Sequence, residues 1–180
     1  RRQRQMCIRD SIDRVAAKLG INVIETAVGF KHVGEAMRKN KVIIGGEESG
    51  GLSIQGHIPE KDGLLANLLI LETMASTGKS LIELQDDLYK IAGCRFYTDR
   101  IDLKLDNQEE IKPILEKVKQ LQNIGEYTVT SIDTIDGVKL MLGDTTKILV
   151  RPSGTEPLLR IYFETDNRKK LEDLKNKNFI

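Results

Sequence analysis

The chain has 180 residues, of which 39% are hydrophobic and 31% are charged, and this balance is typical of a soluble globular protein with one or two domains. Its formal net charge is +1, and the basic residues are interleaved with acidic ones, so nucleic-acid and membrane-surface partners are not expected. The apolar runs are too short for a membrane-spanning helix, and two cysteines, Cys7 and Cys94, without ligand-like neighbours favour a reducing, cytoplasmic compartment over a disulfide or zinc framework.

Residues 1–11 differ in composition from the rest of the chain. The segment RRQRQMCIRDS resembles an in-frame translation of a sequencing-library adaptor, so we interpret it as an artefact rather than as protein. The alternative is a basic N-terminal arm that is solvated or contacts a partner. The segment carries four arginines and one aspartate, and without it the net charge becomes −2.

From residue 12 to residue 92 the pattern alternates between helix and strand, which predicts an α/β layer. Helices are expected at 12–20, 31–40, 62–78 and 80–93, and strands at 22–27 and 41–46. Ser80 and Glu83 form a capping-box pattern, and the last two helices are expected to be amphipathic. We assign residues 12–92 to a partial α/β domain, the remnant of a three-layer sandwich.

Near Gly93 the pattern changes to that of an α+β domain. The alternation at 96–105 predicts a half-buried antiparallel strand, and a helix is expected within 108–123, where Pro113 prefers the first turn. Further strands are expected at 127–132, 138–142, 147–151 and 160–164, before a lysine-rich helix that runs to the end of the chain. We assign residues 93–180 to a domain with an antiparallel sheet, truncated at its C-terminus.

The segment GGEESGG at 45–51 is a candidate site because it follows a predicted parallel strand, where open α/β sheets bind ligands. Its glycines allow a tight turn, and Glu47 and Ser49 could point together at neighbouring hydroxyl groups. This favours a polyol ligand, although a solvated acidic turn or a helix cap has the same composition.

Two flanking segments add cations. HIPEKDG places His57 and Lys61 before the helix at 62–78, whose N-terminus would favour an anion, although a lone histidine is as often structural. Lys31, in GFKHV, lies at a predicted loop-to-helix junction. Alone it would be an ordinary surface lysine.

The segment RPSGTEPLLRIY at 151–162 has the composition of a phosphate-binding loop. A phosphate dianion prefers a guanidinium, hydroxyl donors and free backbone amides in a concave turn. The segment supplies them in Arg151, Ser153, Gly154 and Thr155. A decorated hairpin turn is the alternative, since Ser, Gly and Pro also suit turns. Arg160 opens the next strand, where it could instead pair with Glu156 or Glu164.

The four segments, in their order and spacing, resemble the α-D-phosphohexomutase family (phosphoglucomutase/phosphomannomutase), whose members interconvert hexose 1-phosphates and 6-phosphates through a bisphosphorylated intermediate. The resemblance implies the family's third domain followed by a mobile fourth domain. It implies sugar binding by Glu47 and Ser49, and binding of the non-transferred phosphate by the loop at 151–155. Lys31, and with it His57 and Lys61, would line the same cleft.

The family's donor phosphoserine, in a Ser-His-Asn motif of the first domain, and the Asp-rich Mg²⁺ loop of the second domain do not occur here. The resemblance therefore implies that this chain holds no catalytic and no metal-binding residue, and that Mg²⁺ is bound by the second domain. It also implies that the fragment alone is inactive. Its partners would be a phosphorylated hexose and the missing N-terminal domains of the same enzyme.

Two other functions stay open. Phosphoglucosamine mutase shares the phosphate loop, but its sugar loop more typically has glutamine and histidine where this chain has Glu48 and Gly51, which favours phosphoglucose or phosphomannose. A stand-alone, non-catalytic phosphosugar-binding module would also lack the donor serine and the metal loop.

Overall fold

The computed structural model describes residues 2–5, 10–47, 49–135, 137–154 and 156–180. It divides into two compact units, Arg1–Arg95 and Phe96–Ile180. This division lies close to the predicted boundary between residues 92 and 93.

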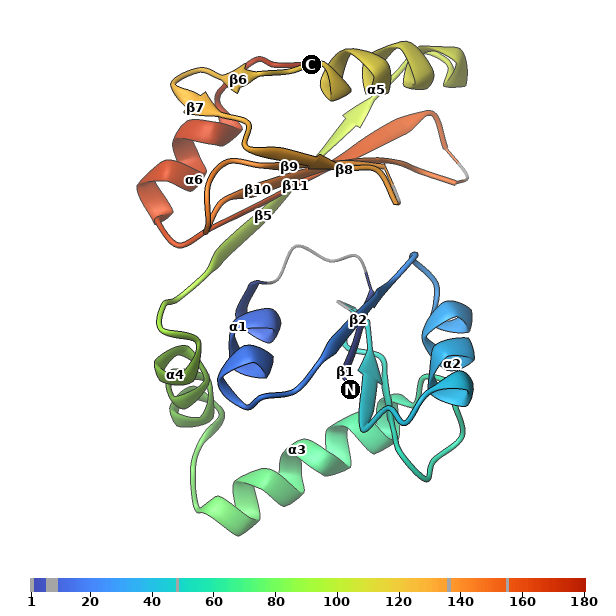
Figure 1. The fold of residues 1–180 in the computed structure, drawn as a ribbon, viewed down its shortest axis with the longest axis vertical. Coiled ribbons are helices and arrows are strands. Elements are labelled where there is room, and N and C mark those ends of the chain that lie inside the picture. The colour runs from blue at the N-terminus through green and yellow to red at the C-terminus, as the bar shows by residue number, and fades with distance from the viewer. Residues whose placement is uncertain (1, 6–9, 48, 136, 155) are drawn as a thin grey trace. The chain divides into compact units, whose positions relative to one another are not determined.

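The first unit is built on a four-stranded sheet with strand order β2-β1-β3-β4 (Figure 1). Its strands are β1 (Arg2–Gln5), β2 (Val23–Thr26), β3 (Ile44–Gly46) and β4 (Leu52–Ile54). β1 pairs in parallel with β2 and β3, and β4 runs antiparallel to β3. Strand β4 was not predicted, because three residues between two glycine-rich turns are too few for a periodic signal.

Helices cover this sheet on both sides, as Figure 1 shows for α1 (Asp10–Lys18) and α2 (Phe30–Lys39). The buried residues include Val15 and Ala16 of α1 and Phe30 and Val33 of α2. The remaining helices are α3 (Gly63–Thr77) and α4 (Leu81–Ala92). The predicted α/β layering is confirmed.

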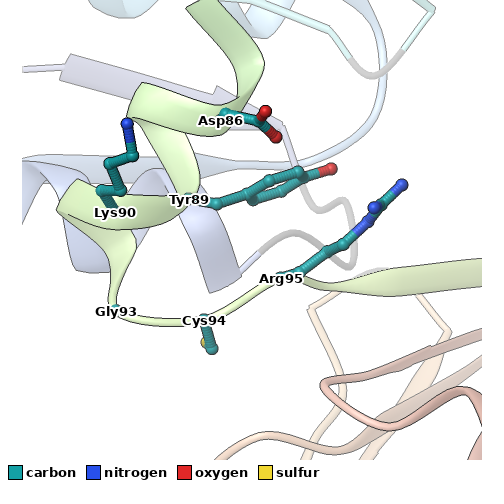
Figure 2. Close-up of a pocket in the computed structure, with 6 residues that line it drawn as sticks. All are labelled: Asp86, Tyr89, Lys90, Gly93, Cys94 and Arg95. Carbon is teal, nitrogen blue, oxygen red and sulfur yellow. The ribbon is translucent and has the colours of Figure 1, made fainter. Parts of the chain in front are cut away.

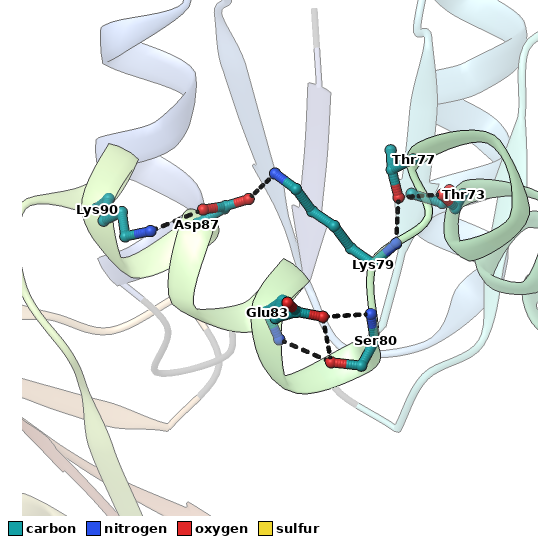
Figure 3. A network of polar contacts seen from close by, with 7 residues as sticks. All are labelled: Thr73, Thr77, Lys79, Ser80, Glu83, Asp87 and Lys90. Carbon is teal, nitrogen blue, oxygen red and sulfur yellow. Dashed lines mark hydrogen bonds and ion pairs between the residues drawn. The ribbon is translucent and has the colours of Figure 1, made fainter.

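Helix α4 begins at the predicted cap. The Ser80 side chain accepts a hydrogen bond from the Glu83 amide, and the Glu83 carboxylate accepts one from the Ser80 amide at 2.8 Å (Figure 3). An ion pair between Lys79 and Asp87 ties the connection to the second turn of α4. These contacts fix the sharp change of direction between α3 and α4.

Helix α3 departs from the prediction, because it is apolar on all sides and none of its residues is buried. Leucine and isoleucine occupy the consecutive positions 68–71 instead of recurring every third or fourth residue. The expectation of an amphipathic helix at 62–78 is therefore wrong, although the helix itself is confirmed.

The second unit contains a five-stranded antiparallel sheet with strand order β5-β11-β10-β9-β8. Its strands are β5 (Tyr97–Lys104), β8 (Ser131–Asp133), β9 (Val138–Met141), β10 (Lys147–Pro152) and β11 (Leu158–Thr165). A two-stranded sheet joins β6 (Asn123–Ile124) and β7 (Tyr127–Thr128), and the helices are η1 (Gln108–Glu110), α5 (Ile111–Lys119) and α6 (Arg168–Lys175).

The core of the second unit lies between one sheet face and the helices, with Val118 of α5 and Leu174 of α6 packed against Leu140, Val150 and Phe163. The predicted antiparallel α+β domain is confirmed. The last helix ends at Lys175 and does not continue to the end of the chain.

Strand β1 lies in the middle of its sheet, yet its sequence is RQRQ. Parallel strands covered on both faces are normally runs of apolar residues. The polar sequence therefore conflicts with the fold around it. The interpretation of residues 1–11 as an artefact stays a prediction.

We expect Gln3→Val combined with Gln5→Val to raise the free energy of unfolding by about 1 kcal/mol, because β-branched residues suit a central strand. Urea unfolding followed by circular dichroism measures the change. Thr98→Val, at an exposed position of the edge strand β5, is the control and should change stability little. A double variant less stable than its parent would mean that the polar strand belongs there.

Candidate substrate-binding site

The glycine-rich segment forms the tip of the β3–β4 hairpin. The Glu47 amide donates to the Gly51 carbonyl at 2.8 Å, and the Gly50 amide donates to the Glu47 carbonyl at 3.1 Å. Ser49 is exposed at the tip, whereas only 10% of the Glu47 side chain is exposed. The hairpin thus presents a hydroxyl group outward and holds a carboxylate inward.

The loop after β4 folds back over this hairpin. The Asp62 amide donates to the Leu52 carbonyl at 3.0 Å, and the buried Ser53 hydroxyl donates to the Ile58 carbonyl at 2.6 Å. These bonds place Lys61 Nζ 3.5 Å from Glu47 Oε2, with 58% of the lysine side chain exposed. A hydrogen-bond acceptor and a cationic donor therefore lie side by side at the hairpin.

Gly51 makes this pair possible by leaving room for the lysine stem. A Cβ atom at residue 51 would lie 3.1 Å from Lys61 Cβ and 3.3 Å from Glu47 Oε2. Both distances are tighter than ordinary van der Waals contacts. A larger side chain at residue 51 would have to displace Lys61, Glu47 or both.

His57 and Asp62 form a second pair beside the first, with His57 Nε2 3.1 Å from Asp62 Oδ2. The other oxygen, Asp62 Oδ1, accepts hydrogen bonds from the amides of Leu64 at 2.9 Å and Leu65 at 3.1 Å. Asp62 is thus the N-cap of α3. The expected external anion at this helix N-terminus is corrected, because the carboxylate of Asp62 already binds these amides.

Lys31 stands apart from these pairs. It is exposed in the first turn of α2 and forms no ion pair with the residues that the structure describes. Its helix is nevertheless anchored near the hairpin, because Gly34 of α2 lies against the Pro59 carbonyl in the loop that carries His57 and Lys61.

In the second unit, the predicted phosphate loop connects β10 to β11. The Ser153 amide donates to the Leu158 carbonyl at 2.9 Å and closes the hairpin, so this amide is not available to a ligand. Ser153 is 7% exposed and Gly154 is exposed. Thr155 lies outside the described residues.

Arg151 of β10 and Arg160 of β11 are direct cross-strand partners. Both are half-buried, and Arg160 Nε is buried without a hydrogen-bond partner among the described residues. The neighbouring carboxylate on β5, Asp102, pairs with Arg100 at 3.0 Å. Arg160 forms no ion pair with Glu156 or Glu164, so that alternative is wrong for the part of the chain that the structure describes.

A surface hollow of about 430 Å³ at the end of α4 was not predicted. Figure 2 shows its lining residues: Asp86, Tyr89, Lys90, Gly93, Cys94 and Arg95. The Arg95 guanidinium lies 5.4 Å from the centre of the Tyr89 ring. Lys90 and Cys94 point away from this pair (Figure 2). The polar groups do not converge as they do in most ligand sites, so the hollow is not a candidate.

Metal and membrane features were also sought. Among the described residues, no group of three or more His, Cys, Asp or Glu side chains is arranged to hold a metal ion. No helix in this described part of the chain combines the length and the apolarity needed to cross a membrane.

The chain thus folds as an α/β domain followed by an α+β domain with an antiparallel sheet. Residues 4–91 match the family profile described as "Phosphoglucomutase/phosphomannomutase, alpha/beta/alpha domain III". Residues 101–179 match "Phosphoglucomutase/phosphomannomutase, C-terminal domain". The chain therefore belongs to the phosphoglucomutase/phosphomannomutase family.

Known relatives agree with this family assignment. A phosphoglucomutase/phosphomannomutase of Thermococcus kodakarensis is 35% identical over 162 residues, which are 90% of this chain and 33% of that protein. A phosphoglucosamine mutase of Bacillus subtilis is 32% identical, over 89% of this chain and 32% of that protein. A crystal structure assigned as a phosphomannomutase of Thermus thermophilus superposes with a TM-score of 0.76 at 31% identity, covering 96% of this chain and 34% of that chain. The chain thus spans about a third of the length of these relatives.

We expect Gly34→Ala to destabilise the first unit by about 1–3 kcal/mol, because the added Cβ would lie 2.2 Å from the Pro59 carbonyl oxygen. Gly63→Ala is the matched control in the first turn of α3, where a Cβ meets nothing within 4 Å, and should stabilise by about 0.4–1 kcal/mol. Urea unfolding measures both. Equal effects of the two changes would contradict the close approach of α2 to the loop.

A pH dependence follows from the cap of α3. The Leu65 amide, and then the His57 ring, lower the pKa of Asp62 from its ordinary value. A lowered pKa in the folded state stabilises the fold above the ordinary carboxyl range, and this contribution is lost as pH falls through the lowered value. In Asp62→Asn, the amide oxygen still caps the helix but does not titrate.

The stability difference between the parent and Asp62→Asn should therefore shrink as pH falls below about pH 4, close to the ordinary pKa of aspartate. Urea unfolding at a series of pH values gives this difference, in which contributions of the other carboxylates cancel. A difference that does not change between pH 5 and pH 2 would be inconsistent with the cap.

Proposed function

We propose that this chain is the sugar-gripping and phosphate-binding part of a phosphoglucomutase/phosphomannomutase. The whole enzyme would interconvert hexose 1-phosphates and 6-phosphates by intramolecular phosphotransfer through a bisphosphorylated sugar. The observation that carries the proposal is the arginine pair on β10 and β11, with a buried guanidinium N–H that has no described partner.

Arg151 and Arg160 leave the same face of the sheet at directly facing positions, where Cβ atoms are about 5 Å apart. A buried N–H group without an acceptor adds a penalty of about 1–3 kcal/mol. A phosphate dianion beside Arg160 would remove this penalty and would accept charge-assisted hydrogen bonds from Arg160 and Arg151. The Ser153 hydroxyl and the Gly154 amide border the same loop.

Sugar recognition would fall to the hairpin of the first unit. Glu47 is nearly buried and held by Lys61, so its carboxylate keeps one orientation and can accept hydrogen bonds from ring hydroxyl groups. Ser49 would add a hydroxyl contact from the exposed tip. His57 and Lys61 would border this site, and Lys31 would reach it only from the start of α2.

These groups suit a substrate that binds in two orientations. The phosphoryl group moves from the enzyme's phosphoserine to one end of the sugar, the bisphosphate turns around, and the phosphoryl group at the other end returns to the serine. A pocket that accepts either phosphate group would serve both orientations. So would contacts to ring hydroxyl groups whose positions are roughly exchanged when the sugar turns around. Phosphoryl transfer depends mainly on positioning and charge stabilisation, so binding groups of this kind contribute to the rate.

The remaining parts of the proposal concern groups outside this chain. The family resemblance brings in Mg²⁺, and the described residues do not fit such a site because they form no ligand cluster. We therefore assign the metal to the second domain and the donor serine to the first. On this proposal the chain alone is inactive, and the enzyme works in the cytoplasm with a phosphorylated hexose.

Phosphoglucosamine mutase remains a second candidate, because relatives with this name share similar identity with the chain. Gly51 weighs against it. A histidine at this position would crowd Lys61 and Glu47 in the present arrangement. A non-catalytic phosphosugar-binding module would use the same contacts, and only a mutase assay with the other domains separates it from the enzyme.

The binding part of the proposal can be measured on the 180-residue chain. We expect glucose 6-phosphate to shift the amide resonances of residues 151–160, and Arg151→Ala or Arg160→Ala to weaken binding at least about tenfold, since each removes a charge-assisted hydrogen bond of about 1.5–3 kcal/mol. Arg168→Ala, an exposed arginine of α6, should leave the affinity unchanged. Equal affinities for all three variants would refute the assignment of the loop.

Activity needs the rest of the enzyme. We expect a chimera that joins this chain to the N-terminal part of the Thermococcus kodakarensis relative to convert glucose 1-phosphate to glucose 6-phosphate, and Arg151→Ala to lower its turnover at least about tenfold. The same chimera assayed with glucosamine 6-phosphate distinguishes the second candidate. Tight phosphosugar binding by a folded chimera without turnover would favour the binding module.

A further inference from the structure

Helix α3 has the sequence of a buried helix but the exposure of a surface helix. Four of its large apolar side chains are among the most exposed of the chain: Leu64 at 78%, Leu68 at 63%, Leu71 at 59% and Ile70 at 47%. Glu72 is the only charged residue between Gly63 and Thr77. A helix that is hydrophobic all round is normally buried on all sides.

The first unit cannot itself cover α3. Among the described elements of the first unit, α3 packs mainly against β4. Figure 1 shows α3 as a rod along the edge of the unit, with the sheet approaching it near its first turns. Contiguous exposed apolar surface usually marks an interface. Leu81 and Ile82, which open α4, are also exposed, at 55% and 73%.

We infer that α3 is an interdomain helix whose exposed sides are covered by the N-terminal domains of the full-length enzyme. The matched profiles are those of domain III and the C-terminal domain, so a complete family member places further domains before this chain's residues. The relatives are about three times as long as the matched region. This inference rests on family membership and not on the phosphosugar site.

A second copy of this chain fits the helix less well. A twofold dimer buries one self-complementary strip of a helix. Apolar residues on every side of α3 would leave the other sides in water. A folded domain that lies along α3, opposite β4, buries more of its circumference. The near absence of charge on α3 also matches the apolar centre of a permanent interface and not the polar rim of a transient one.

Thiol labelling tests the inference. In a background with Cys7→Ser and Cys94→Ser, Leu68→Cys places one thiol in the middle of α3, and Lys112→Cys places a control thiol at an exposed position of α5. We expect Cys at residue 68 to react readily in the 180-residue chain and at least about tenfold more slowly in the chimera with the Thermococcus kodakarensis N-terminal part. The control thiol should react equally in both proteins.

Two outcomes overturn the inference. One is equal reactivity at residue 68 in the chain and the chimera; if the chimera does not fold, the same comparison is made by adding the separately expressed N-terminal part to the labelled chain, and absence of protection counts equally. The other is a dimer of the 180-residue chain by size-exclusion chromatography in which residue 68 is already protected, since the occupant of α3 would then be a second copy.

Discussion

The proposed phosphate site depends on keeping two like charges side by side. Arg151 and Arg160 face each other because β10 and β11 pair in one register, which the Ser153–Leu158 hydrogen bond closes and the Val150–Ile161 pair continues into the core. A slip by one residue would turn one guanidinium into the apolar face, so core packing fixes the register and the register fixes the charges. The buried face of the sheet, with Phe163 and Leu140, stabilises these strands independently of the arginines.

The β3–β4 hairpin, which we propose to bind the sugar, holds a carboxylate instead of arginines. Only 10% of the Glu47 side chain is exposed, and Lys61 Nζ lies 3.5 Å from its carboxylate. Lys61 reaches Glu47 because its loop is held at both ends, by the Ser53–Ile58 bond and by Asp62, whose amide bonds to β4 and whose carboxylate caps α3. Asp62 therefore caps α3 and also fixes the position of Lys61.

The features that could be predicted from the sequence are those that depend on residues close together in the chain. The capping box at Ser80 and the alternation in β5 depend on residues close together in the chain, so both could be predicted. The composition of the loop at 151–155 could be recognised in the same way. The contacts that define the site are not local. Nothing in the sequence indicates that Arg160 lies opposite Arg151 and not beside Glu164, that Lys61 crosses Gly51 to reach Glu47, or that Asp62 occupies the helix N-terminus expected to attract an anion. Each of these depends on how separate segments fold against one another.

In two elements, α3 and β1, the residue types do not suit their place in the fold, and they do so in opposite ways. In α3, residues that are too apolar for water lie exposed. Missing surroundings produce this kind of conflict, because adding a covering domain removes it without changing a residue. In β1, the polar run RQRQ lies at the centre of a sheet. The first disagreement therefore concerns what surrounds the chain, and the second concerns the residue types of β1 itself.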